Sequence, residues 1–524
     1  MTHRQILFVI YGLMAGMFLA ALDQTVVGTS IKTIADDLDG LSLQAWVTTA
    51  YLMVSTISTP IYGKLSDTYG RKPFYVFAIA IFVVGSVLCG IATNIYELAA
   101  YRAVQGIGAG GLLSLAFAII GDLVPPRSRG RYQGYFLAVF GISSVLGPVI
   151  GGTFAGQTTL LGIDGWRWIF FLNVPLGLLA AVVVVKRLSL PRKRSSAPID
   201  FLGAGLLTTT VVPGLLLAEK GRDWGWGSPL ALSMMALSVL SLIAFVAVER
   251  RMGENAILPP RIFQSSVFNL TSVTALLIGV GMFGGLVVLP LYLQIVRGGS
   301  PTEAGLQLTP LMLGIFVTSS VSGIFMKRTG RYKPLPIAGT ALMFLALMLM
   351  STLGVDTPLW QAMTYMVLMG MGLGLSMQTL VIAVQNALPP ADMGVATSSV
   401  TFFRSLGGTL GAAVSLAILF GSLAGNIQDR ARAAGLPQAV VDRFSSASSL
   451  NDSSVIATLP DAVRQVVLEG FADSMQMVFA VVAALLVPAF VLSLLTKEIP
   501  LRAHGGMQAA AADSAAARAE SAVL

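Results

Sequence analysis

Charged residues, cysteine and histidine are scarce in this sequence. Only 11% of its 524 residues are Asp, Glu, Lys or Arg, against about 25% in typical soluble domains. The single cysteine, Cys89, excludes a disulfide framework and a cysteine-based metal site. The two histidines, His3 and His504, lie outside every apolar run, which excludes a buried histidine proton relay.

A phosphate-binding motif is also missing. The chain has no GxxxxGKS or GxxxxGKT loop, and the glycine-rich GIGAGG at 106–111 follows no predicted strand. We therefore expect no nucleotide hydrolysis and no enzyme activity, and we predict no cofactor and no metal site. A receptor or channel would need a ligand-binding domain or a polar pore helix, and the chain offers neither outside a polar segment at 422–471.

Long apolar runs dominate the sequence instead. Hydrophobic residues make up 55% of the chain and the mean hydropathy is +0.79. A helix needs roughly 20 apolar residues to cross a bilayer, and no strand-like alternation interrupts the runs. The sequence therefore predicts an all-α membrane protein. Its net charge of +8 then relates to topology and not to nucleic-acid binding.

Fourteen stretches are long enough to span a membrane. We predict transmembrane helices at 5–29, 44–63, 74–93, 97–121, 133–157, 167–187, 200–218, 229–248, 266–293, 302–326, 335–354, 359–386, 395–421 and 472–496. Lys and Arg of the short loops fall mainly on the side of the N-terminus, and cytoplasmic loops are enriched in these residues. We therefore predict a multi-pass protein of the cytoplasmic (inner) membrane with both termini cytoplasmic.

Two loops of similar sequence divide the chain into related halves. GKLSDTYGRKP starts at Gly63, and GIFMKRTGRYKP starts at Gly323. Related halves with a site between them are typical of transporters. We predict an N-terminal six-helix bundle at 1–190, two inserted helices with linkers at 191–262, a C-terminal six-helix bundle at 263–504 with an outer loop at 422–471, and a disordered cytoplasmic tail at 505–524. The end of the outer loop, PDAVRQVVLEGF, has helical periodicity.

One carboxylate stands inside the first apolar run. Asp23 lies in LAALDQTVVGTS, and a charge at membrane depth costs several kcal/mol, so such residues usually belong to an ion or proton pathway. The alternative is a residue near the helix end that reaches the lipid headgroups. Arg102 lies at a similar predicted depth in the span 97–121, so an ion pair between the two is geometrically possible.

Several motifs resemble the major facilitator superfamily, specifically its fourteen-span drug:proton antiporters of the EmrB and QacA type. They are LDQTVVGTS, GKLSDTYGRK, RAVQGIGAGG, GPVIGG and WRWIFFLNVPLG. The resemblance covers all the predicted spans. It implies the major facilitator fold, with two six-helix bundles plus two inserted central helices, and it implies that Asp23 and Arg102 form a proton-coupling site.

The resemblance also implies a conformational latch in the loop GKLSDTYGRK. In the family this loop holds the two halves together on the cytoplasmic side in the outward-facing state. The latch candidates are Gly63, Asp67, Gly70, Arg71, Asp122, Arg129 and Arg131. The alternative is a basic turn that only fixes topology. The C-terminal copy has Lys327 in place of Asp67, so the N-terminal copy carries the acidic part of the latch.

A third implied element is the antiporter motif of the span 133–157. The small residues and the proline that form it are Gly141, Gly147, Pro148, Gly151 and Gly152. In the family this motif bends the helix and seals it against the other half. Ordinary close packing of small residues between helices is the alternative.

Polar side chains within the spans are candidates for a substrate cavity. They are Gln24, Tyr51, Gln105, Asn173, Gln294, Gln378 and Arg404. Each of them is also compatible with a hydrogen bond between helices. Methionines crowd residues 343–377, where they favour either an adaptable pocket or core packing.

These features together predict a proton-coupled antiporter that exports amphipathic small molecules, as in multidrug efflux. A dedicated exporter of one metabolite, lipid or antibiotic on the same scaffold is the alternative. A proton is favoured over sodium because one carboxylate with an arginine offers few oxygen ligands to a metal ion. The predicted partners are the substrates, protons and the lipid bilayer, with no nucleic acid. We predict a monomer and leave a periplasmic adaptor open.

Overall fold

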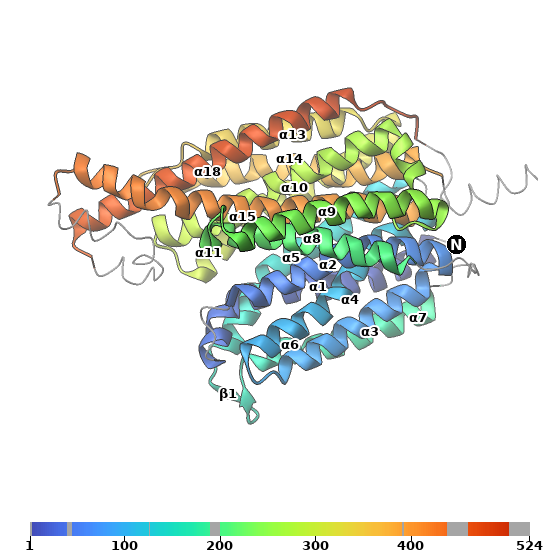
Figure 1. Cartoon of the computed structure of the whole chain (residues 1–524), viewed down its shortest axis with the longest axis horizontal. Coiled ribbons are helices and arrows are strands. Elements are labelled where there is room, and N and C mark those ends of the chain that lie inside the picture. Colours follow the sequence, from blue (N-terminus) through green and yellow to red (C-terminus); the bar gives the residue numbers. More distant parts are fainter. Residues whose placement is uncertain are drawn as a thin grey trace, which may run out of the picture.

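The computed structural model describes residues 3–38, 44–124, 126–188, 200–389, 392–436 and 459–501. Helices make up nearly all of this part of the chain, and they run roughly along the long axis of the molecule (Figure 1). The fold class predicted from the apolar runs is therefore confirmed as all-helical.

The helices of the N-terminal half are α1 (His3–Asp37), α2 (Gln44–Tyr69), α3 (Arg71–Gly90), α4 (Ile95–Leu123), α5 (Pro126–Ala155), α6 (Arg167–Phe171) and α7 (Asn173–Arg187). Two further helices follow, α8 (Phe201–Trp224) and α9 (Pro229–Met252), and then the short turns η2 (Gly253–Asn255) and η3 (Pro260–Gln264). The C-terminal half contains α10 (Ser266–Leu291), the π-helix η4 (Tyr292–Val296), α11 (Pro301–Gln307), α12 (Thr309–Thr329), α13 (Pro334–Met350), α14 (Leu359–Ala387), α15 (Met393–Ala433) and α18 (Asp461–Leu495).

Every predicted transmembrane range overlaps one helix or two consecutive helices. Eleven stretches of the described chain are long and apolar enough to cross a membrane, fewer than the fourteen predicted. The helix α13 is apolar but has only 17 residues. The helices α2 and α5 are rich in Ser, Thr and Gly, which lower their hydropathy.

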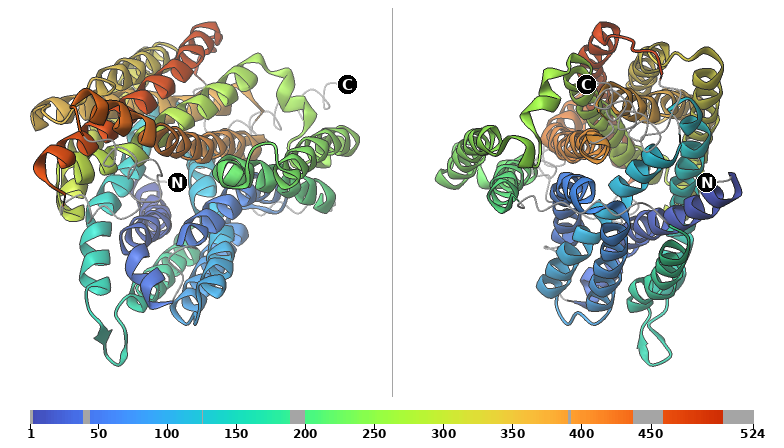
Figure 2. Two further views of the ribbon diagram at one scale, coloured as in Figure 1. Left: turned by 60° about the vertical axis from the view of Figure 1, so that its left-hand side comes forward. Right: turned by 90° about the vertical axis from the view of Figure 1, so that its right-hand side faces the viewer.

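The helices pack as two halves that meet along α2, α5, α12 and α15. Within the N-terminal half α4 packs against α2 and α3, and α1 against α5. Within the C-terminal half α10 and α18 pack against α15, and α14 against α12 and α13. The halves contact each other through α5 with α12 and α2 with α15, while α8 and α9 form a pair beside them (Figure 2).

The two copies of the repeated sequence motif share a backbone conformation where a helix ends. Gly70 separates α2 from α3 with φ 103°, and Gly330 ends α12 with φ 71°. Positive φ is a conformation that glycine adopts readily and that other residues rarely adopt. Gly70 and Arg71 lie at one end of the molecule, which we call the Arg71 end. We call the opposite end the Trp166 end.

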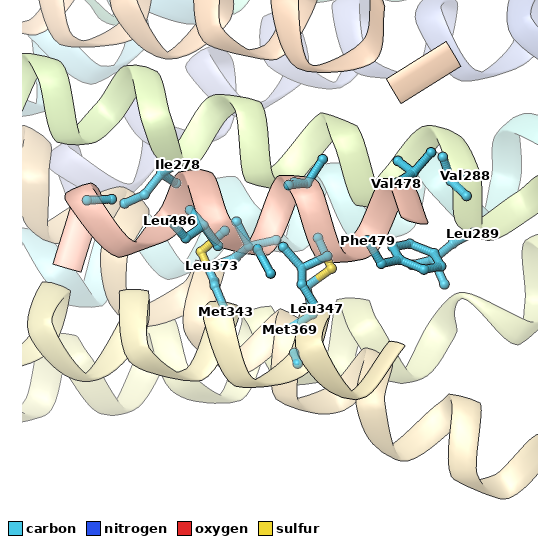
Figure 3. Close-up of a cluster of buried hydrophobic side chains, with 14 of the residues drawn as sticks. Ile278, Val288, Leu289, Met343, Leu347, Met369, Leu373, Val478, Phe479 and Leu486 are labelled. Atoms are coloured by element: carbon cyan, nitrogen blue, oxygen red, sulfur yellow. The ribbon is translucent and has the colours of Figure 1, made fainter. Parts of the chain in front are cut away.

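The methionines at 343–377 contribute mainly to the core of the C-terminal half. Met343, Met350, Met366 and Met369 are fully buried. Figure 3 shows Met343 and Met369 packed among apolar side chains that include Leu347 and Phe479. These contacts support core packing over an adaptable pocket at these positions.

Two local features differ from the sequence prediction. The outer loop predicted at 422–471 is shorter, because α15 continues to Ala433 and α18 begins at Asp461. Ion pairs from Arg430 to Glu469 and Asp473 join the two helix extensions. The second feature is a hairpin, β1 (Thr159–Leu160) and β2 (Ile163–Asp164), whose two turn residues both have positive φ, as in tight hairpins.

We predict that Gly108→Ala destabilises the N-terminal half. A Cβ at Gly108 would lie 2.6 Å from the backbone oxygen of Ala78 and 2.6 Å from the backbone nitrogen of Phe82, so α3 and α4 would have to separate. Overpacking of this kind costs about 1 to 3 kcal/mol. The measurement is the melting temperature of the purified protein in detergent.

Gly152→Ala is the matched control, because a Cβ at Gly152 meets nothing within 4 Å. Equal melting temperatures for the two variants would contradict the predicted role of the close helix contact.

Candidate functional site

Asp23 lies deep in the N-terminal half. The helix α1 continues to Asp37, fourteen residues beyond Asp23, which corresponds to about 21 Å at 1.5 Å per residue. Only 1% of Asp23 is exposed. The alternative of a helix-end carboxylate that reaches the headgroups does not fit this position.

The carboxylate of Asp23 accepts hydrogen bonds from three side chains. Arg102 donates from one guanidinium nitrogen to Oδ2 at 2.5 Å, which makes a buried ion pair. Gln105 donates to Oδ1 at 2.9 Å, and Asn173 donates to the same oxygen at 2.8 Å. Both oxygens are therefore occupied by donors from α4 and α7, as burial of an ionised carboxylate requires.

The partners of Asp23 are themselves held by neighbours. Arg102 also donates to Gln105 Oε1 at 2.7 Å, and its guanidinium stacks over the ring of Tyr51, 4.1 Å from the centroid. Ser86 of α3 accepts hydrogen bonds from Gln105 at 3.2 Å and Asn173 at 2.8 Å. The network thus joins α1, α2, α3, α4 and α7.

Ser86 was not predicted from the sequence as a site residue. Tyr51, Gln105 and Asn173 were predicted to line a substrate cavity, and the structure brings all three to the Asp23 site. Ser86 carries the same signal as these residues, since it is a polar side chain in an apolar span. That signal is weak because a serine readily bonds to its own helix.

Four other predicted cavity residues make no side-chain hydrogen bond to this network within the described chain. Gln24, Gln294 and Arg404 are half-buried, and none of them makes a side-chain hydrogen bond or ion pair with another described residue. Gln378 is buried, and its Oε1 has no donor within the described residues. These side chains are compatible with a cavity, and no contact with another described residue assigns them to one.

The latch candidates form a second charged cluster at the Arg71 end. The guanidinium of Arg71 binds Asp67 at 2.5 Å and Asp122 at 2.8 Å. Asp67 also accepts hydrogen bonds from the backbone nitrogens of Gly394 at 3.0 Å and Val395 at 2.7 Å, in the first turn of α15. Asp67 therefore caps a helix of the other half, where a carboxylate is favoured by the unsatisfied N–H groups.

The remaining latch candidates fall into two groups. A Cβ at Gly63 would lie 2.9 Å from the carbonyl oxygen of Gly394, so this glycine permits close contact between α2 and α15. Arg129 and Arg131 belong to α5, but their side chains lie outside the described part of the structure.

The small residues of α5 pack mainly within their own half. A Cβ at Gly147 would meet Thr25, and one at Gly151 would meet Thr29 and Ser30, all on α1. A Cβ at Gly141 would lie 3.7 Å from Met312 of α12 in the other half, whereas one at Gly152 would meet nothing within 4 Å. The side chain of Pro148 lies outside the described part. These contacts favour ordinary helix packing for Gly147 and Gly151.

Sequence comparison relates the chain to transporters. A profile described as Major Facilitator Superfamily matches residues 13–412. The chain is 36% identical to the multidrug transporter protein MdtP of Bacillus subtilis (strain 168), over 87% of this chain and 84% of that protein. It is 33% identical to multidrug resistance protein 3 of the same strain, over 90% and 91% of the two chains.

Solved structures of similar fold are also transporters. They include the proton:xylose symporter XylE bound to 6-bromo-6-deoxy-D-glucose, with TM-score 0.59 and 16% identity over 95% of this chain and 97% of that chain. The human organic anion transporter MFSD10 matches with TM-score 0.57 and 15% identity over 93% and 99%. At such identities the likeness shows the fold alone.

We predict that removal of one member of the ion pair lowers the stability of the protein more than removal of both. Arg102→Met leaves the carboxylate of Asp23 without its counter-ion, and removal of one member of a buried pair costs about 3 to 5 kcal/mol. Asp23→Asn combined with Arg102→Met removes both charges. The double variant should therefore melt at a higher temperature than Arg102→Met alone.

The measurement is thermal unfolding of the two purified variants in the same detergent. A double variant that melts as low as the single variant, or lower, would contradict the prediction.

Proposed function

The chain belongs to the major facilitator superfamily, and on this premise we propose that it is a proton-coupled antiporter that exports amphipathic small molecules across the cytoplasmic membrane. The superfamily makes it a membrane transporter and not an enzyme. The multidrug names of several relatives support an export role. The observation that carries the proposal is the buried ion pair of Asp23 and Arg102.

Proton coupling is assigned to Asp23 because it is a buried carboxylate deep in its helix, with a single cationic partner. A proton on Asp23 neutralises it and weakens its attraction to Arg102, which alters the contacts among α1, α4 and α7. Loss of the proton restores the ion pair. Export and proton uptake are coupled if the two arrangements of these helices favour different access to the substrate cavity.

Alternating access in this proposal depends on the latch at the Arg71 end. Asp67 joins the halves through the first turn of α15, so the described structure has the halves in contact at this end. We assign this end to the cytoplasm, both termini included, and the contact to the outward-facing state. Fourteen spans then follow if α2, α5 and α13 cross the membrane as their neighbours do.

Substrates are proposed to bind between the halves, near Gln24, Gln294, Gln378 and Arg404. These side chains are polar, come from both halves and have no partner of their own among the described residues. Breadth of substrate separates a multidrug exporter from a dedicated one. Transport of lipophilic cations and neutral drugs into proteoliposomes is the measurement that decides between them.

We predict that Asp23→Asn abolishes substrate accumulation driven by a pH gradient in proteoliposomes. The amide preserves the shape of the side chain and removes the group that titrates. Exchange of substrate down its own gradient should persist. Asp36→Asn is the matched control, because Asp36 lies on the same helix and is exposed. If Asp23→Asn still concentrates substrate, Asp23 is not the coupling residue.

We predict that Asp67→Asn opens the Arg71 end. A charge at a partly buried helix terminus contributes about 1 to 2 kcal/mol, which changes a two-state population roughly five- to thirty-fold. Ser398→Cys in a Cys89→Ser background reports the opening, because Ser398 is 1% exposed and packs against Gly63. Maleimide should label this cysteine several-fold faster in Asp67→Asn.

The control for this experiment is Asp356→Asn, which removes an exposed carboxylate away from the latch. Equal labelling rates in the parent and in Asp67→Asn, at equal expression, would contradict the latch. They would indicate that the loop GKLSDTYGRK only fixes topology.

A further inference from the structure

Two buried carboxyl groups lie where the inserted helices end, apart from the sites described above. Asp200 immediately precedes α8, and Glu249 lies in the last turn of α9; each is 4% exposed. One oxygen of each carboxyl group accepts a hydrogen bond from a backbone nitrogen. Asp200 Oδ1 accepts from the nitrogen of Gly203 at 2.7 Å, and Glu249 Oε2 accepts from the nitrogen of Leu258 at 2.7 Å.

The other two oxygens face each other. Asp200 Oδ2 and Glu249 Oε1 are buried, and neither has a donor among the described residues. A Cβ built on Gly203 would lie 2.4 Å from the first and 2.8 Å from the second, so both oxygens occupy the same small space. The two oxygens are therefore at most 5.2 Å apart, which is the sum of these two distances.

Two ionised carboxylates this close together in a buried site repel each other and lack the water that would screen them. A metal ion could satisfy them only with further ligands, and within the described chain no three His, Cys, Asp or Glu side chains group as a metal site. One proton held between the two oxygens supplies the missing donor and removes one of the charges. Carboxyl pairs elsewhere share a proton in this way.

The charged groups around the pair do not supply a salt bridge to it. Lys64 of α2 interacts with Glu249 less strongly than with Asp392 and Asp67, and its ammonium donates to the backbone oxygen of Glu254. Arg261 pairs with Glu254 at 2.6 Å and with Asp392 at 2.7 Å. On α9 itself, Arg250 and Arg251 are exposed.

We propose that Asp200 and Glu249 form a second proton-binding site, in which one proton is shared between Asp200 Oδ2 and Glu249 Oε1. The site is distinct from Asp23 and does not depend on the coupling role proposed for it. Its ligand is the proton alone. The shared hydrogen bond fastens the start of α8 to the end of α9, and Glu249 extends the connection to Leu258 in the linker.

The linker that follows α9 connects this site to the contact between the halves. Residues 253–264 reach α2 through Lys64 and the start of α15 through Asp392. Asp392 precedes the turn of α15 that Asp67 caps. Loss of the shared proton leaves a second negative charge near Lys64, which draws the ammonium away from the linker. The site thereby links pH to the Arg71 end.

Infrared spectroscopy of the full-length protein in lipid nanodiscs tests the proposal. A protonated carboxyl group gives a C=O stretching band that a carboxylate does not, and titration to alkaline pH should remove one such band from the parent. Glu249→Gln and Asp200→Asn should each lack this band, whereas Asp36→Asn should retain it. Comparison with Asp23→Asn identifies any band that belongs to the coupling site.

An alkaline titration of the parent that removes no carboxyl band would overturn the proposal, and that measurement requires no variant. A band that keeps its full amplitude in both Glu249→Gln and Asp200→Asn would overturn it as well. These outcomes leave the result for Asp23→Asn in transport unaffected, so the two proposals fail separately.

Thermal stability gives an independent readout. In Glu249→Gln the amide can donate to Asp200 Oδ2 at every pH, so this variant should match the parent at acidic pH and exceed its melting temperature at alkaline pH. Asp200→Asn should behave in the same way. Variants that melt far below the parent at every pH would show a structural role without a shared proton.

Discussion

The ion pair of Asp23 and Arg102 is the interaction on which the arrangement of the N-terminal half depends. Burial of two charges costs several kcal/mol per ion unless their geometry and hydrogen bonds offset it. Here the carboxylate receives donors from Arg102, Gln105 and Asn173. Those donors come from two helices, so α1, α4 and α7 must all converge on one point. Close approach of α3 to α4 at Gly85 and Gly108 brings Ser86 to the same point.

This convergence explains which parts of the site the sequence could predict. Asp23 and Arg102 stand out because a charge in an apolar run needs a partner. Gln105 and Asn173 stand out only as polar residues, and their periodicity does not tell a cavity from a hydrogen-bond network. The assignment of these two and Tyr51 to a substrate cavity stays a prediction, and the contacts found place all three beside Asp23 or Arg102. Their common partner is visible only when the helices are placed together.

Other contacts of the structure could not be predicted from the sequence. Asp67 binds the backbone of α15, and backbone nitrogens have no side-chain signature, so its partner at Gly394 and Val395 could not be predicted. Asp200 and Glu249 lie at the ends of the predicted spans 200–218 and 229–248, where charged residues are common. The extension of α15 to Ala433 carries the ion pair of Arg430 with Asp473, which lies 43 residues further along the chain. By contrast, Gly70 and Gly330 occupy equivalent positions of the repeated motif, and both have positive φ in the structure.

The repeated turns also show how the two halves differ. Both copies keep the glycine with positive φ, but Lys327 and Arg331 of the second copy are exposed, and neither forms an ion pair with a described residue. The first copy has Arg71 between Asp67 and Asp122, with Asp67 on the first turn of α15. The glycine turn is thus duplicated, whereas the electrostatic contact across the halves is made by one copy.

A single capping carboxylate contributes about 1 to 2 kcal/mol in a partly buried site. An interaction of that size holds one arrangement of the halves while still allowing it to be broken in each transport cycle, and a second equal contact would shift the balance about five- to thirty-fold further toward closure.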